Sequence, residues 1–164
     1  MSDIALQHAA AYAARHHLLL AERLGFGIHG TVHVAEHEGK QDRSAVKAHN
    51  SVAFYAKERA VYERLRVVGV TEVLGFHVPQ LIRSDDELWI IEMSIVTRPF
   101  LLDFAGAQLD CRPEFSEEIW AEWESEKREQ FGLQWKTVLA VMDRLEALGI
   151  CMADVSPTNI AFAQ

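Results

Sequence analysis

The sequence predicts an α+β fold, with a strand-rich first part followed by a mainly helical second part. Residues 31–37 alternate between two faces, as half-buried strands do, and a polar turn at 38–42 that contains a glycine separates them from the run 43–49. We therefore expect the two strands to pair as an antiparallel hairpin. In the later segments 113–131 and 133–148, apolar residues instead recur at helical spacing, which predicts two long helices.

Two further helices are expected within the strand-rich part. The alanine-rich stretch 4–17 follows Ser2-Asp3, whose side chains suit a helix cap. The second helix runs from Ser51 to Val68, with Asn50 or Ser51 as its cap, and it ends near Gly69.

Shorter elements complete the predicted pattern. We expect an extended segment from residue 18 to the first glycines, strands at 78–83 and 88–93, a short helix at 99–106 and a strand at 160–162. No repeat or proline-rich joint divides the sequence. We place the boundary between two lobes after residue 93, so that residues 1–93 form the first lobe and residues 94–164 the second.

Charge and composition narrow the functional classes. The 164 residues carry a formal net charge of -8, and 49% of them are apolar, enough for a buried core. A chain this acidic has no basic stripe to neutralise a phosphate backbone, so we expect no nucleic-acid partner. The glutamates crowded between residues 114 and 129 are interpreted as the solvated face of a helix.

The sequence also predicts a cytoplasmic protein with no membrane partner. Its two cysteines, Cys111 and Cys151, cannot form a disulfide framework, which suits a reducing compartment. The N-terminus lacks the pattern of a signal peptide, and no apolar run reaches the roughly 18 residues that a membrane span needs.

A glycine-rich turn, Gly25-x-Gly27-x-x-Gly30, stands between two predicted extended segments. In a dinucleotide-binding fold, the third glycine would open a helix. The β-branched, alternating residues after Gly30 instead predict a strand, so we expect a hairpin flap. The backbone N–H groups of such a flap can approach phosphate oxygens closely.

Lys47 lies in a predicted apolar strand, and the helix that follows carries a matching carboxylate. On a helical wheel, Glu58 falls within an apolar stripe formed by Phe54, Val61, Leu65 and Val68. Burying an unpaired carboxylate is costly. We therefore expect Glu58 to pair with Lys47 and to hold it against the phosphates of a nucleotide.

The last part of the sequence adds an aspartate and an asparagine. Asp154 and Asn159 lie in one loop, which follows the last predicted helix and precedes the strand at 160–162. Such a loop can place Asp154 to accept a hydroxyl proton, and the amide oxygen of Asn159 to reach Mg²⁺.

In this order, the motifs resemble the protein-kinase-like superfamily in a minimal, bacterial form. The segments 24–32, 45–47, 58–65, 91–94 and 154–159 are similar to its glycine loop, strand lysine, αC helix, adenine hinge and catalytic loop. The resemblance implies an antiparallel sheet lobe with one αC-type helix, a truncated helical lobe, and ATP and Mg²⁺ as cofactors. The nucleotide-binding residues that it implies are Gly25, Gly27, Gly30, Val32, Ala45, Lys47, Glu92, Met93 and Ser94. The catalytic residues that it implies are Lys47, Glu58 and Asp154, with Asn159 as a metal ligand.

The sequence departs from the family pattern at three places. Met152-Ala153 stands where a His-Arg or His-Gly pair usually precedes the aspartate, and Ser156 replaces the lysine that protein kinases direct at the terminal phosphate. No Asp-Phe-Gly-like sequence follows Asn159, where the family carries its magnesium-binding aspartate. We therefore expect either a shortened chain or a minimal relative, with weak turnover or none.

Three functions remain open from the sequence. The leading hypothesis is a kinase-like ATP-binding protein, acting as a weak phosphotransferase on a hydroxyl of a protein or a small molecule. The alternative is a catalytically inactive, pseudokinase-like module that binds a protein partner or a second copy over its helical lobe. A dedicated small-molecule phosphotransferase is the third, favoured by Ser156.

Two other groups of residues are interpreted as ordinary structure. His29, His33 and His37 recur every fourth residue, but on a strand they lie too far apart to share a metal ion, so we expect surface histidines. The tryptophans of the second part are expected in the core of the helical lobe.

Overall fold

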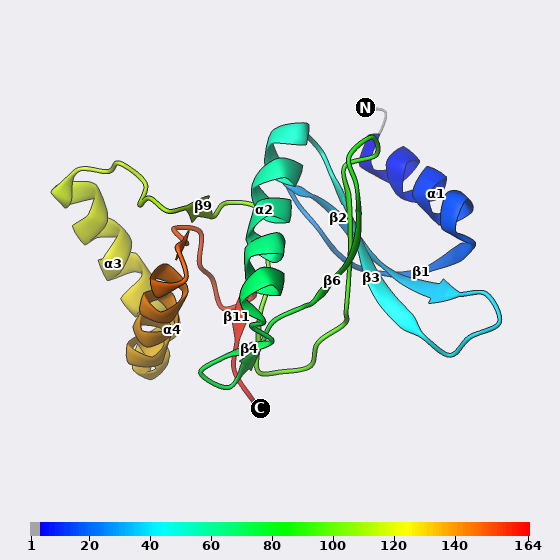
Figure 1. Cartoon of the computed structure of the whole chain (residues 1–164). Helices are drawn as coiled ribbons and strands as arrows, with labels where there is room; N and C mark the ends of the chain where they lie inside the picture. The colour runs from blue at the N-terminus through cyan, green and yellow to red at the C-terminus, as the bar shows by residue number, and fades with distance from the viewer. Residues whose placement is uncertain (1–3) are drawn as a thin grey trace.

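The protein has an α+β fold with an antiparallel sheet, as the sequence predicts (Figure 1). The structure is a computed structural model, and it describes residues 4–164. The order of strands in the main sheet is β1 (Leu18–Phe26), β2 (Gly30–His37), β3 (Arg43–His49), β7 (Ile90–Met93) and β6 (Leu81–Asp85). Every neighbouring pair in this sheet is antiparallel, and the predicted hairpin forms β2 and β3.

Two helices cover opposite faces of the main sheet. Val46 and Ala48 of β3 pack with α1 (Ile4–His16) in one hydrophobic cluster. Ala45 belongs to a second cluster, which contains the buried face of α2 (Val52–Val68). Because side chains alternate across a strand, Lys47 points to the same side as Ala45, toward α2.

Helix α1 lies against the sheet through small side chains. Its buried residues are Ala5, Ala9, Tyr12 and Ala13. The cap predicted at Ser2-Asp3 lies outside the described residues. Within residues 4–164, no helix combines the length and the apolar character that crossing a bilayer would require.

Helix α2 begins and ends as predicted. The Ser51 side chain accepts a hydrogen bond from the Phe54 N–H at its start, and Gly69 follows its last turn in the left-handed conformation, with a φ of 69°. The buried residues of α2 are Tyr55, Glu58, Val61, Tyr62 and Leu65. The predicted stripe was wrong at its two ends, because Phe54 is only half-buried and Val68 is exposed.

The two long helices of the second part are present. The Ser116 side chain caps α3 (Glu117–Phe131), and a short 3₁₀ turn, Gly132–Gln134, leads into α4 (Trp135–Ala147). The helix predicted at 99–106 is wrong. That segment contains β8 (Phe100–Leu101), which pairs with strands on both sides, and the left-handed φ of 62° at Asp103 is incompatible with a helix.

Very short strands connect the two parts of the chain. In a second sheet, β11 (Ile160–Ala161) pairs with β8, β8 with β5 (Phe76–His77), and β5 with β4 (Glu72–Val73). A separate pair joins β9 (Gln108–Leu109) to β10 (Ile150–Cys151). The second sheet therefore contains residues from both sides of the lobe boundary predicted after residue 93.

Glu92 of β7 forms a buried polar cluster beneath α1. Its carboxylate accepts hydrogen bonds from the hydroxyls of Tyr12, at 2.7 Å, and Ser44, at 2.8 Å. Arg83 lies 2.8 Å away and completes an ion pair. Burial raises the pKa of Glu92, but these hydrogen bonds outweigh it and the pKa is lowered. The carboxylate therefore stays charged and ties α1 to the sheet.

Removing one of these hydrogen bonds should loosen α1. We expect Tyr12→Phe to lower the free energy of unfolding by about 1–3 kcal/mol, since a buried charged acceptor loses a donor. Urea denaturation measures the change. Tyr62→Phe is the control, because that tyrosine is equally buried but makes no hydrogen bond with its hydroxyl among residues 4–164. Equal effects of the two substitutions would contradict the prediction.

Candidate functional site

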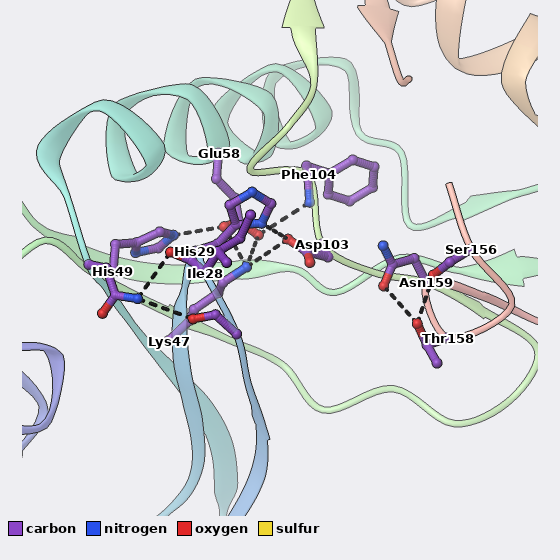
Figure 2. Close-up of polar contacts among 12 residues, drawn as sticks. Ile28, His29, Lys47, His49, Glu58, Asp103, Phe104, Ser156, Thr158 and Asn159 are labelled. Carbon is purple, nitrogen blue, oxygen red and sulfur yellow. Dashed lines mark hydrogen bonds and ion pairs between the residues drawn. The ribbon is translucent and has the colours of Figure 1, made fainter. Parts of the chain in front are cut away.

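A cleft of about 610 Å³ lies where the main sheet, α2 and the second part of the chain meet. The turn between β1 and β2 covers it from one side. Lys47 and Glu58 lie at its back, and Asp103 and the loop 154–159 line the opposite wall. Figure 2 shows the side chains of Lys47, Glu58 and Asp103 converging in this cleft, with Asn159 facing them.

The glycine-rich turn is a hairpin flap, not the start of a helix. Strand β2 begins directly at Gly30, and the Gly27 N–H donates to the Gly30 carbonyl across the turn at 2.9 Å. The Asn50 side chain donates to the carbonyls of Gly27 and Ile28, at 3.1 and 3.0 Å. A side chain at Gly30 would collide with the backbone carbonyl of Ala48, so this glycine is required for the close approach of β2 to β3. The dinucleotide-binding alternative is excluded.

The ion pair predicted between Lys47 and Glu58 is present and buried. The Lys47 ammonium lies 2.7 Å from one oxygen of Glu58 and 3.0 Å from the other. Burial raises the pKa of Glu58, but the charge of Lys47 and the hydrogen bond from His49 outweigh it and lower the pKa to about 2. Burial lowers the pKa of Lys47, and the charges of Glu58 and Asp103 outweigh it and raise the pKa. Both groups are therefore charged near neutral pH.

His49 is a second partner of Glu58 that the sequence did not reveal. Its Nε2 lies 2.7 Å from Glu58, and its Nδ1 lies 2.9 Å from the backbone carbonyl of Trp89. Both neighbours are hydrogen-bond acceptors. The Phe104 N–H also donates to Glu58, at 3.3 Å. Donors from β3 and from the segment after β8 thus fix the carboxylate in place.

Asp103 brings a second carboxylate to the lysine. Its Oδ1 lies 3.0 Å from the Lys47 ammonium, and its side chain is 32% exposed, so it remains accessible from the cleft. The next residue, Phe104, is fully buried and packs edge-to-face on Tyr62 of α2, with ring centroids 5.5 Å apart. The sequence analysis did not single out Asp103, because the family pattern predicts a metal-binding carboxylate only after Asn159.

Strand pairing explains how Asp103 reaches the loop 154–159. In the antiparallel pair of β8 and β11, Leu101 lies opposite Ile160, and the Leu102 N–H donates to the Asn159 carbonyl at 2.8 Å. Asp103, which follows β8, therefore lies close to Asn159, which precedes β11. Gly106 lies against Asp154, since a side chain there would come within 3.3 Å of the Asp154 Cβ.

The loop 154–159 is held by its own hydrogen bonds and by α3. The Asn159 N–H donates to the Ser156 carbonyl at 3.0 Å, and the hydroxyls of Ser156 and Thr158 lie 2.7 Å apart. The Trp123 indole N–H donates to the Ala153 carbonyl at 2.7 Å, just before Asp154. Asp154 itself is exposed at the mouth of the cleft. A tryptophan of α3 thus braces the loop.

Most of the predicted site residues meet in the cleft. Those that line it are Gly25, Gly27, Gly30, Val32, Ala45, Lys47, Glu58, Met93, Ser94, Asp154 and Asn159. Glu92 does not line the cleft, because it lies opposite Val46 in the sheet and its side chain faces α1. Ser94 lines the cleft, but its N–H already donates to the Gln80 carbonyl at 2.9 Å.

The surface position predicted for the histidines is wrong for two of the three. His33 is buried on β2. His29 lies on the flap, and its side chain is only 13% exposed because it turns inward and lines the cleft. The alternation of β2 alone could not show this, since His29 precedes the strand and its direction is set by the turn.

Comparison with known proteins adds no assignment. No protein-family model matches the chain, and no curated protein matches it. Among residues 4–164, no group of three or more His, Cys, Asp or Glu side chains is placed to hold a metal ion by itself. The functional argument therefore depends on the geometry of the cleft.

The pairing of Glu58 should make stability depend on acid. The unfolded chain protonates this carboxyl near pH 4.5, whereas the folded protein keeps it ionised down to about pH 2. We therefore expect the free energy of unfolding to fall between these pH values, by about 3 kcal/mol from this group. Chemical denaturation from pH 6 to pH 2 measures it.

Glu58→Gln should lose this part of the acid dependence and be less stable at neutral pH, because Lys47 loses its buried partner. The matched control is Glu63→Gln on the same helix, whose side chain is 38% exposed and pairs with Arg59. If the free energy of unfolding of Glu58→Gln falls between pH 4.5 and pH 2 as much as that of the unaltered protein, Glu58 is not ionised in the folded protein.

Proposed function

We propose that this protein binds ATP with Mg²⁺ in the cleft and transfers the terminal phosphoryl group to a hydroxyl. The observation that carries the proposal is the position of the Lys47 ammonium, held between a buried carboxylate and an accessible one beneath a glycine flap. Glu58 fixes the lysine from behind, and Asp103 faces the cleft. This arrangement combines a positioned cation for phosphate with an accessible carboxylate for a metal ion.

The apolar end of the cleft suits the base of the nucleotide. Val32 and Ala45 of the sheet and Met93 at the end of β7 line it, and a planar aromatic ring can be sandwiched between such side chains. The flap lies over the phosphates, and no side chain at Gly25 or Gly27 keeps them from approaching its backbone. The glycine-rich turn and Lys47 would thus contact the phosphates, and the segment at Met93 would contact the base of the same nucleotide.

Asp103 and Asn159 would hold the metal ion. Mg²⁺ prefers oxygen ligands and is usually bound by one or two protein groups together with the phosphates of a substrate. One carboxylate and one amide oxygen on adjacent strand ends meet that requirement. When bound, the ion neutralises charge on the phosphates and orients them.

Asp154 is the group that we assign to the acceptor. It is exposed at the mouth of the cleft and close to the Asp103–Gly106 segment. Its carboxylate would take the proton of the acceptor hydroxyl while the oxygen bonds to the terminal phosphorus and ADP leaves. Ser156, a small neutral residue in the same loop, favours a small-molecule acceptor over a protein.

The alternative of a catalytically inactive interaction module was motivated by the missing magnesium-binding aspartate. Asp103 supplies a carboxylate in the same cleft, so the lack of an aspartate after Asn159 is no longer an argument for the inactive module. A turnover assay with ATP against sugars, aminoglycosides and proteins separates the two functions. Hydrolysis or transfer above the background rate supports the enzyme, and its complete lack with intact ATP binding supports the interaction module.

Nucleotide binding should depend on Lys47. We expect Lys47→Ala to weaken the binding of ATP with Mg²⁺ about tenfold or more, because the phosphates lose a charge-assisted hydrogen bond. Isothermal titration calorimetry measures it. Lys57→Ala, at an exposed position of α2, should leave the affinity unchanged. If the unaltered protein does not bind ATP in the presence of Mg²⁺, the proposed function is wrong.

The two aspartates of the cleft should behave differently. Asp154→Asn should keep ATP affinity within about twofold but reduce turnover by about 10² or more, since it removes the base alone. Asp103→Asn should reduce turnover and also raise the Mg²⁺ concentration needed for half-maximal ATP binding. Asp143→Asn, on the exposed face of α4, serves as control. Identical behaviour of the two variants would contradict their separate roles.

A further inference from the structure

His29 lies at the tip of the flap, and its side chain turns into the cleft. Its neighbours Phe26 and Ile28 are 76% and 77% exposed, whereas the His29 side chain is 13% exposed. Its Nδ1 lies 3.6 Å from Oδ1 of Asp103, and its ring packs edge-to-face on Phe54 of α2, with centroids 4.7 Å apart. Figure 2 shows the ring above Lys47 and beside Asp103.

The position of this ring is fixed by the backbone on which it stands. The Asn50 N–H donates to the His29 carbonyl at 3.0 Å, and the Asn50 side chain donates to the carbonyls of Gly27 and Ile28. Phe54 supports the ring from the helix side. A flap tied to β3 in this way presents His29 to the cleft at little further cost in side-chain entropy.

The side chains that line the cleft offer little positive charge to a bound phosphate. Lys47 is its only lysine or arginine among the described residues that line it, and two carboxylates already share that ammonium. Ser156 supplies no positive charge from the loop. His29 is the other basic side chain among the described residues that line the cleft, and an imidazole ring carries at least one N–H in either protonation state.

We infer that His29 donates an N–H to the terminal phosphate of the bound nucleoside triphosphate. The inference rests on the proposed function and names which phosphate the flap recognises. A terminal phosphate held near Lys47 and Asp103 lies directly below the tip of the flap, where the His29 Nδ1 already faces an anionic oxygen at 3.6 Å. The nucleotide thereby offers the ring a closer acceptor than Asp103. Recognition by a side chain makes the flap selective for a triphosphate over a diphosphate.

The test compares ATP with ADP, both with Mg²⁺, by isothermal titration calorimetry. Three substitutions separate the N–H from the packing: His29→Ala removes both, His29→Phe keeps an aromatic ring on Phe54, and His29→Gln keeps an N–H donor. We expect His29→Ala and His29→Phe to weaken ATP binding about tenfold or more. ADP affinity should stay within about twofold, and His29→Gln should retain most of the preference for ATP. Lys57→Ala, at an exposed position of α2 outside the cleft, is the control.

Several outcomes would overturn the inference. An equal loss of ATP and ADP affinity would mean that His29 only supports the flap. Tighter binding of both nucleotides to His29→Ala would mean that the ring blocks the cleft. If the unaltered protein binds ATP and ADP equally well, the inference is wrong but the proposed function stands. If it binds neither nucleotide, both are wrong. The thermal melting temperature of each variant shows that it is folded, and His29→Phe still tests the N–H if His29→Ala unfolds.

Discussion

The buried ammonium of Lys47 is the interaction on which the site depends. An unpaired charge at this depth would cost several kcal/mol, so the carboxylates around it are a condition of folding as well as of binding. Glu58 provides the buried partner and is itself fixed by His49 and the Phe104 N–H. The two ion pairs of Lys47 thus join strand β3, helix α2 and the segment after β8, and they position the wall of the cleft.

The carboxylate on the accessible side reaches the cleft from an unexpected place in the chain. In the family that the motifs resemble, the metal-binding aspartate follows the catalytic loop, whereas Asp103 precedes both long helices. Pairing of β8 with β11 and of β9 with β10 brings its segment beside the loop 154–159. Two-residue strands are sufficient for this, because the buried side chains around them supply the stability.

The sequence predicted what local patterns determine. Alternation defined the hairpin of β2 and β3, and residue types at Ser51 and Gly69 placed the ends of α2. It could not predict contacts that depend on register or on distant pairing. Glu92 illustrates the first limit, since a shift of one residue in β7 would have turned its side chain from α1 into the cleft. Asp103 illustrates the second, because two-residue strands leave no periodic signal.

Under the proposed function, the charges that line the cleft would also link the nucleotide to its metal ion. Apart from histidine and tyrosine, the ionisable lining among residues 4–164 consists of one lysine and the carboxylates of Glu58, Asp103 and Asp154. A triphosphate alone would bring more negative charge next to Asp103 and Asp154, and the low dielectric of a cleft strengthens that repulsion. A divalent cation between phosphate and Asp103 converts the repulsion into attraction. Nucleotide and cation should therefore enter this site as one unit, with Lys47 alone too weak to hold the free anion.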